Sequence, residues 1–194
     1  MTGVQTCALP ISLTGNSAAD GGGASDGLLV KCTLTGNSAE GLGGGARYCI
    51  LFTCAISGNS SSLAGGGAAQ STLNNCTLTS NSALWDGGGV VESTLTNCIV
   101  YFNSAPSGAN HSSSTFYNSC TTPLPWGAAN ITSDPLLASS SHLSASSPCR
   151  GAGSAVPATN TDIDGETWAS PPAIGCDELD RKSTRLNSSH GKLS

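Results

Sequence analysis

Thiols and carboxylates are the side chains with which this 194-residue chain could do chemistry, since it contains nine Cys, twelve Asp or Glu and only three His. A structural zinc site is typically built on C-x-x-C pairs, and the sequence contains no C-x-x-C motif. Five cysteines recur instead at an interval of 22 residues: Cys32, Cys54, Cys76, Cys98 and Cys120. A residue repeated at a fixed interval indicates a structural role, so we expect this column to consist of buried thiols.

The carboxylates in the same part of the sequence do not form a catalytic pair if the 22-residue units stack as parallel strands. Asp20 and Asp86 occupy equivalent positions three units apart, and so do Asp26 and Glu92. Three strand spacings amount to about 14 Å, whereas the two carboxyl groups of a glycosidase are roughly 5 to 9.5 Å apart. We therefore expect no catalytic residues and no cofactor in this chain.

Asp162 and Asp164 are weak candidates for metal binding. They belong to residues 160–165, N-T-D-I-D-G, a run that resembles the start of a calcium-binding loop. The twelfth position of such a loop would be Pro171 instead of the Glu that binds calcium through both oxygens. A turn-forming role is therefore the favoured interpretation.

Several other polar or aromatic residues lack a chemical partner in the sequence. His111 and His142 stand alone in loop-like segments, and we expect surface or capping roles for both. Trp85 precedes a run of glycines and would be either a sugar-stacking ring or a hydrophobic plug, of which we favour the plug. Cys149 and Cys176 lie outside the 22-residue pattern, so they are the best candidates for one disulfide, which would suit an extracellular protein.

The 22-residue period extends well beyond the cysteines. With 25 Gly, 10% charged and 38% hydrophobic residues, the chain is too apolar and too weakly charged for a generic disordered segment. Each unit offers only about four apolar positions, too few to close a core alone, so neighbouring units must stack. The columns with this period are Asn37, Asn59, Asn81 and Asn103; Leu34, Ile56, Leu78 and Val100; Leu29, Leu51, Leu73, Leu95 and Tyr117; and the glycine runs 43–45, 65–67 and 87–89.

These columns predict the fold. Short segments rich in Thr, Ser and aliphatic residues, separated by Gly and Asn, favour strands of about three to five residues joined by tight turns. About three such strands per unit, wound once around an axis and paired with the next unit, make an all-β, single-stranded parallel β-helix, or solenoid, with about 22 residues per coil. Glycine would supply positive φ at the turns, and identical Asn side chains would hydrogen-bond in a ladder along the axis.

The repeats resemble those of right-handed parallel β-helix proteins, especially the repeats of the polymorphic outer-membrane-protein family. The family's Gly-Gly-Ala-aliphatic motif is similar to Gly-Gly-Gly-Ala at 43–46 and 65–68. Its Phe-x-x-Asn motif is similar to residues 34–37 and 56–59, where an aliphatic residue replaces Phe. The resemblance implies a right-handed coil, and the same fold hosts pectate lyases and polygalacturonase-like hydrolases.

The closing segment resembles that of choice-of-anchor Q domain proteins, in which a surface β-helix is followed by a sorting signal. The resemblance is carried by 133–137 (SDPLL), 142–143 (HL), 147–149 (SPC), 162–165 (DIDG) and 174–178 (IGCDE). It implies a secreted or cell-surface protein, although we find no signal or anchor in this fragment.

The sequence divides into four parts. Residues 1–12 and 180–194 resemble translated sequencing-adaptor read-through and are interpreted as non-native. Residues 13–122 are the β-helix repeats, and residues 123–179 are a loop-rich C-terminal cap. Residues 13–179 hold three of the seven basic residues but eleven of the twelve acidic ones, so we expect no nucleic-acid partner. No segment approaches the roughly 18 consecutive apolar residues of a membrane span.

These features predict a noncatalytic extracellular or cell-surface β-helix protein with a structural or adhesive role, because the polar columns are uniform and no charged site converges. Its partner would be a cell-surface polysaccharide or another surface protein. The first alternative is a polysaccharide lyase or glycosidase whose catalytic coils are missing from the fragment, and the second is a noncatalytic glycan-binding module. We also expect self-association through the open N-terminal coil.

Overall fold

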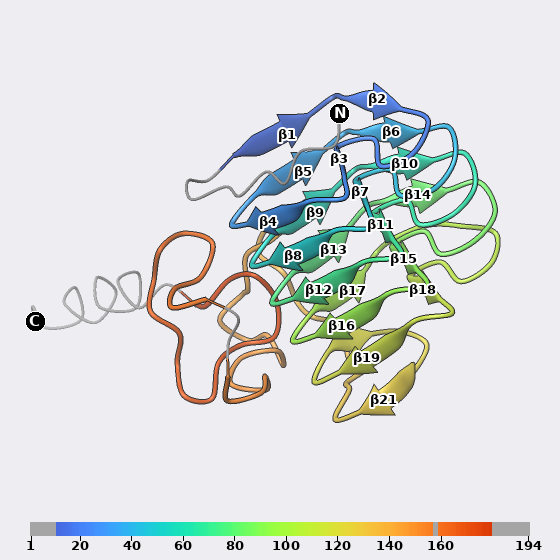
Figure 1. Ribbon diagram of the computed structural model, residues 1–194. Coiled ribbons are helices and arrows are strands. Elements are labelled where there is room, and N and C mark those ends of the chain that lie inside the picture. The colour runs from blue at the N-terminus through green and yellow to red at the C-terminus, as the bar shows by residue number, and fades with distance from the viewer. Residues whose placement is uncertain (1–10, 157–158, 180–194) are drawn as a thin grey trace, which may run out of the picture.

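The computed structural model describes residues 11–156 and 159–179. Within these residues every regular element is a strand, and all pairings between the strands are parallel. Figure 1 shows the coils stacked along one axis, in about five turns. The predicted all-β parallel solenoid with about 22 residues per coil is therefore confirmed, although the chain passes through four sheets where three strands per coil were expected.

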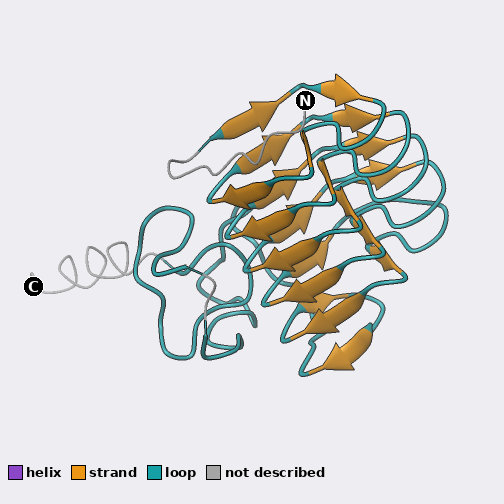
Figure 2. Ribbon diagram, viewed as in Figure 1, coloured by secondary structure: helices purple, strands orange, loops and turns teal. Residues whose placement is uncertain are grey.

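The four sheets are named A to D in the order in which the chain visits them, and loops connect their short strands (Figure 2). Sheet A contains β1 (Ser12–Thr14), β5 (Thr33–Thr35), β9 (Ala55–Ser57), β13 (Thr77–Thr79), β17 (Ile99–Tyr101) and β20 (Cys120–Thr121). Sheet B contains β2 (Ser17–Ala18), β6 (Ser38–Ala39), β10 (Ser60–Ser61) and β14 (Ser82–Ala83). Sheet C contains β3 (Ala24–Ser25), β7 (Ala46–Arg47), β11 (Ala68–Ala69), β15 (Val90–Val91) and β18 (His111–Ser112). Sheet D contains β4 (Leu28–Val30), β8 (Ile50–Phe52), β12 (Thr72–Asn74), β16 (Thr94–Thr96), β19 (Thr115–Tyr117) and β21 (Trp126–Ala128).

The two segments interpreted as non-native fall almost entirely outside the described residues, which exclude 1–10 and 180–194. The exception is the end of the first segment. Ser12 begins β1 and pairs with Thr33 of β5, so the solenoid starts inside the range 1–12.

Two files of aliphatic side chains fill the interior. Leu34, Ile56, Leu78 and Val100 stand in register in sheet A and are fully buried. Sheet D contributes the second file, which consists of Leu29, Leu51, Leu73, Leu95 and Phe116. Burying one such side chain contributes roughly 1.5–3 kcal/mol to stability, so every coil depends on the apolar residues of its neighbours.

The glycine runs lie between sheets B and C and combine a turn with close packing. The first glycine of each run has a positive φ, 70° at Gly43, 68° at Gly65 and 58° at Gly87. The second leaves no room for a side chain, since a Cβ at Gly66 would lie 2.2 Å from the carbonyl oxygen of Ser82. Only glycine satisfies both conditions in one run.

An asparagine ladder forms the corner between sheets A and B. The backbone N–H of each Asn donates to Oδ1 of the next Asn of the ladder at 2.9–3.1 Å, and its Nδ2 donates to the same oxygen. From Asn16 to Asn103 these bonds join one coil to the next, whereas Asn110 ends the ladder from within the same coil as Asn103. The members are Asn16, Asn37, Asn59, Asn81, Asn103 and Asn110. Asn110 takes the place of the third glycine of a run, so the 22-residue period did not reveal it.

Thiols form a similar ladder at the corner between sheets D and A. The N–H groups of Cys32, Cys54 and Cys76 each donate to Sγ of the cysteine in the next coil at 3.4 Å. The residue before each ladder cysteine has a positive φ, and this turn directs the following N–H toward a side chain instead of a strand carbonyl. Burial raises the pKa of Cys54 and Cys76, which keeps these thiols protonated and able to donate in turn to backbone carbonyls.

Hydroxyl groups perform the same task at the corner between sheets C and D. There the N–H of Cys49 donates to Oγ of Ser71 at 3.1 Å, and the N–H of Ser71 donates to Oγ of Ser93 at 3.1 Å. The N–H of Ser93 donates to Oγ of Ser114 at 3.0 Å. Three of the corners therefore use small polar side chains as acceptors for backbone amides that the turns have left without a carbonyl.

From β15 to β18 and from β16 to β19 the interval falls from 22 to 21 residues, which corrects the expected position of Tyr117. Leu95 pairs with Phe116, so Phe116 occupies the interior file. Tyr117 instead points outward and is 43% exposed. Strand side chains alternate between faces, so a shift of one residue moves the aromatic ring from the core to the surface.

The same shift removes Cys120 from the thiol column, where it had been expected. The N–H of Cys98 donates to Oγ of Ser119 at 3.0 Å, and Cys120 pairs with Ile99 in sheet A. Ser119 is as small as Cys and offers the same donor and acceptor, so the ladder continues through it.

The described residues of 129–179, called the C-terminal segment from here on, lie along the outer face of sheet A. Figure 1 shows this segment beside the coils, with β21 at the end of the stack. The hydroxyl of Thr79 donates to the Ser140 carbonyl at 2.9 Å, and the N–H of Cys176 donates to Oγ1 of Thr77 at 3.0 Å. The expected loop-rich cap thus covers a side of the solenoid, while β21 stays exposed.

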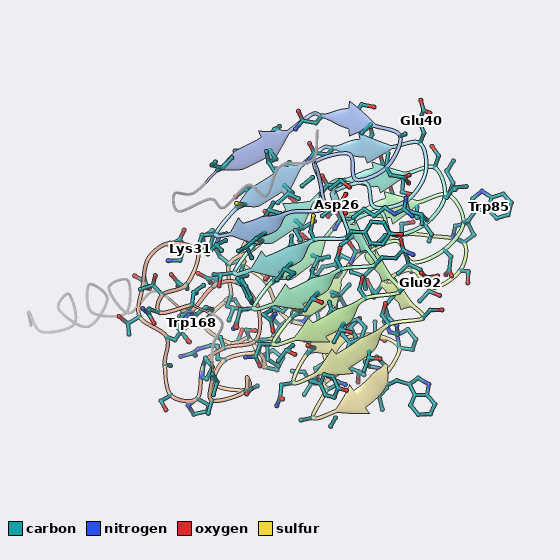
Figure 3. All side chains as sticks on the ribbon, in the orientation of Figure 1. Asp26, Lys31, Glu40, Trp85, Glu92 and Trp168 are labelled. Carbon is teal, nitrogen blue, oxygen red and sulfur yellow. The ribbon has the colours of Figure 1, made fainter. Side chains whose placement is uncertain are left out.

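The C-terminal segment reaches back as far as the early coils. Nζ of Lys31 donates to Oγ1 of Thr161, and Oγ1 of Thr53 lies 2.8 Å from Oγ1 of Thr159. Figure 3 shows Lys31 extending toward this segment. The contacts therefore join one loop-rich stretch to several successive coils.

A second hydrophobic core fills the space between sheet A and the C-terminal segment. Its members are Ile99, Cys120, Leu143, Cys149, Ala173 and Ile174. Ile99 faces outward from β17 at a position that other coils fill with Thr33, Ala55 or Thr77. The C-terminal segment hence packs on the solenoid by apolar burial as well as by hydrogen bonds.

Along the described chain, no helix has the length and apolar character needed to cross a membrane.

The asparagine ladder predicts a large effect of Asn81→Ala on stability. Oδ1 of Asn81 accepts from the N–H and Nδ2 of Asn59, and its Nδ2 donates to the Ile56 carbonyl. Alanine leaves these buried groups without partners, so we expect a loss of about 2–4 kcal/mol in the free energy of unfolding. Urea denaturation measures this loss in the free energy of unfolding. The exposed neighbour Ser82→Ala is the control and should change stability by less than about 0.5 kcal/mol; equal midpoints for both variants would contradict the ladder.

Candidate functional site

The carboxylates of the solenoid lie apart and serve the structure of the coils. Oδ2 of Asp20 lies 2.6 Å from Nη1 of Arg47, which joins two neighbouring coils. Oε2 of Glu92 accepts a hydrogen bond from Nε2 of Gln70 at 2.9 Å, again between coils. Figure 3 shows Glu40 and Glu92 on separate parts of the solenoid surface. These acids therefore do not build a common site.

Three residues of the C-terminal segment, far apart in sequence, do come together. One possible ligand atom from each of His142, Asp164 and Asp177 lies within 4.8 Å of the other two. Nε2 of His142 is 2.8 Å from Oδ2 of Asp164. Asp177 is only 4% exposed, whereas the other two side chains are about half exposed. This group is called the His-Asp cluster, and it combines an imidazole nitrogen with two carboxylates at the protein surface.

Asp162 fixes the backbone next to the His-Asp cluster, but its own side chain is not one of the three members. Its fully buried carboxylate accepts hydrogen bonds from three backbone N–H groups, those of Asp164 at 3.1 Å, Glu166 at 2.7 Å and Glu178 at 3.0 Å. A carboxylate used in this way fixes a turn. Of the two weak calcium candidates, Asp162 thus has the geometry of a turn former, and Asp164 alone enters the cluster.

The electrostatics of the cluster centre on Asp177. Burial raises the pKa of Asp177 to about 6, and the carboxylates of Asp162 and Asp164 contribute in the same direction. The N–H of Leu143, which donates to Oδ2 of Asp177 at 2.8 Å, and the nearby His142 act in the opposite direction. The carboxyl groups of Asp164 and Asp177 therefore share this site with a single imidazole, that of His142.

Ser139 gives the cluster a superficial likeness to a Ser-His-Asp triad. Its Oγ lies 2.6 Å from Nδ1 of His142, and the other ring nitrogen faces Asp164. A catalytic serine needs N–H donors directed at the developing oxyanion. The N–H groups of Ser141 and His142 donate to Oγ of Ser139 itself, so this hydroxyl fixes a turn and orients the imidazole.

A hollow of about 350 Å³ lies near the last coil, bordered by residues 111–115 and 124–126. Trp126 on its rim is 87% exposed and Leu124 is 68% exposed. The ring of His111, which we expected on the surface or in a capping role, lines this hollow, and its Nε2 lies 2.9 Å from the Pro123 carbonyl. An exposed indole beside an open hollow is a surface that a sugar ring could stack on.

Trp85 behaves differently from the expected plug. It points away from the solenoid into solvent (Figure 3) and is 70% exposed. The glycine turn that follows it, at Gly87, needs no cover because its small residues already pack closely against the neighbouring coils. The interpretation of Trp85 as a hydrophobic plug is therefore wrong.

The expected disulfide between Cys149 and Cys176 is absent from the structure, in which both residues are buried thiols. Cys149 instead exchanges a hydrogen bond with Cys120 in the second core; this bond raises the pKa of Cys120, as does burial, and lowers that of Cys149. Cys176 packs against Thr77, and burial raises its pKa to about 12. The two cysteines are held apart because they face different strands of sheet A.

No protein-family model matches this chain, and no curated protein matches it either.

The thiol arrangement predicts which cysteines pair under oxidising conditions. Refolding with oxidised glutathione, which is reduced to two thiols as the new S–S bond forms, should link Cys120 to Cys149. Peptide mapping by mass spectrometry without reduction identifies the linked peptides. Cys176→Ser should leave this link intact, and Cys120→Ser should abolish it. A peptide in which Cys149 is joined to Cys176 would contradict the arrangement.

Proposed function

We propose that this chain belongs to a noncatalytic protein of the cell exterior, secreted or surface-bound, with a structural or adhesive role. The observation that carries the proposal is the asparagine ladder, which joins successive coils without a break from Asn16 to Asn103 and ends on Asn110. A stack that is hydrogen-bonded along its whole axis is stiff and presents a long surface. These are the properties of a stalk or scaffold.

The proposal includes a finer assignment, to the repeat type of the polymorphic outer-membrane-protein family with a closing segment of the choice-of-anchor Q type. Two motifs of that segment, which begin at Asp162 and Ile174, meet in space. Oδ2 of Asp162 accepts from the N–H of Glu178, and the N–H of Ile163 donates to the Cys176 carbonyl at 2.9 Å. Such mutual hydrogen bonding gives the motifs a structural reason to occur together, which supports the assignment.

Binding and cleavage assays test this proposal against a polysaccharide-active enzyme. The purified chain would be immobilised and exposed to acidic and neutral polysaccharides and to intact bacterial cells, with retention as the measurement. In parallel, reducing ends and unsaturated products would be measured in solution. We expect retention of one surface component and no product above a heat-inactivated control. Chain cleavage would overturn the noncatalytic role.

Glycan binding is the second candidate function, and the exposed indole of Trp126 favours it. The hollow beside this residue could hold one or two sugar rings, with the indole as a stacking platform. We expect Trp126→Ala to weaken binding to a glycan array by about tenfold or more. Trp85→Ala is the matched control, because it removes another largely exposed indole that does not border the hollow. Equal losses in both variants would contradict a site at Trp126.

A further inference from the structure

The His-Asp cluster has the composition and spacing of a metal site. A four-coordinate zinc ion with bonds of about 2.0–2.2 Å holds its ligand atoms roughly 3.3–3.6 Å apart. The three candidate atoms lie within 4.8 Å of one another, and Nε2 of His142 is already 2.8 Å from Oδ2 of Asp164. A small inward movement of the Asp177 carboxylate and a slight opening of the His142 to Asp164 contact would complete the geometry.

The surroundings hold each of the three side chains in place. On the far side of the imidazole, Nδ1 lies 2.6 Å from Oγ of Ser139, which can accept a hydrogen bond from Nδ1–H and so leave the Nε2 lone pair for a metal. The Asp177 carboxylate is fixed by the N–H of Leu143, and the backbone of Asp164 is fixed by Asp162. Such outer contacts typically orient the ligands of metal sites.

The charge balance also favours a cation. Asp177 is more than nine-tenths buried, yet its carboxylate faces a second carboxylate at Asp164. Neighbouring Asp162 and Glu178 are buried as well, but backbone N–H groups satisfy them. Of the described ion pairs, only the one between His142 and Asp164 lies in this region. A bound divalent ion would compensate the two carboxylates that face each other.

We propose that Nε2 of His142 and one carboxylate oxygen each of Asp164 and Asp177 bind a divalent transition-metal ion of the zinc class. The imidazole ligand favours zinc over calcium, which prefers oxygen ligands alone. The half-exposed side of the site, at His142 and Asp164, leaves room for water as a further ligand. The ion would join three separate stretches of the C-terminal segment and so stabilise its position on sheet A.

The test uses cobalt(II) as a spectroscopic substitute for zinc with the purified full chain. We expect one cobalt ion per chain, an absorption spectrum typical of nitrogen and oxygen ligands, and displacement by stoichiometric zinc. Zinc should also raise the melting temperature of the wild-type chain, because it binds the folded state. Absence of cobalt uptake, a thiolate-to-cobalt charge-transfer band, or an equal affinity for calcium would overturn the proposal.

Variants identify the ligands. His142→Gln alters a half-exposed side chain and should fold normally, with cobalt and zinc affinity reduced at least about tenfold. Asp177→Asn should have the same effect, and its far-ultraviolet circular dichroism shows whether it has folded. His111→Gln is the matched control, since it removes an imidazole outside the cluster and should bind as the wild type does. Unchanged affinity in His142→Gln, or a loss in His111→Gln equal to that in His142→Gln, would refute the site.

Discussion

The structure depends on one constraint: a backbone amide that turns away from its sheet still needs an acceptor. At each polar corner the residue in the left-handed region directs the next N–H out of the strand ladder. A side chain from the adjacent coil then accepts it, as Asn81 does for Asn59 and Cys76 does for Cys54. Because a buried amide without a partner is costly, every coil must place the same kind of residue at the same point.

This requirement explains how much of the fold could be predicted from the sequence. The interval of 22 residues specified parallel stacking, the files that contain Leu34 and Leu78, and the asparagine ladder. The ends of the asparagine ladder and of the thiol ladder could not be predicted in the same way. Asn110 reaches its place from a glycine position, and the loss of one residue puts Ser119 where Cys120 had been expected. Small polar residues are interchangeable there, so composition alone could not set the register.

The C-terminal segment lacked a period, and its position was harder to predict. One signal was available: Ile99 is apolar where the equivalent outward positions hold Thr or Ala, which indicates a covered face. The candidate metal site had one weak signal, the D-I-D-G run that contains Asp164, and nothing in the sequence joined His142 or Asp177 to it. His142, Asp164 and Asp177 belong to three irregular stretches. The N–H of Asp164 donates to Asp162 and the N–H of Leu143 donates to Asp177, and these bonds bring the two carboxylates into position. Isolated residues in loops therefore concealed a group of three ionisable side chains that the fold brings together.

The asparagine ladder also has a consequence for how such a chain changes length during evolution. Each member receives hydrogen bonds on one side and donates them on the other, so the two faces of an internal coil are complementary to every other coil. Duplication or deletion of a complete 22-residue unit leaves no amide without a partner. Genetic gain or loss of whole units can thus lengthen or shorten the rod in steps. A change of a single residue is compatible with the corners only where a loop absorbs it, as in the 21-residue intervals that still place Asn37 next to Asn16 and Ser114 next to Ser93.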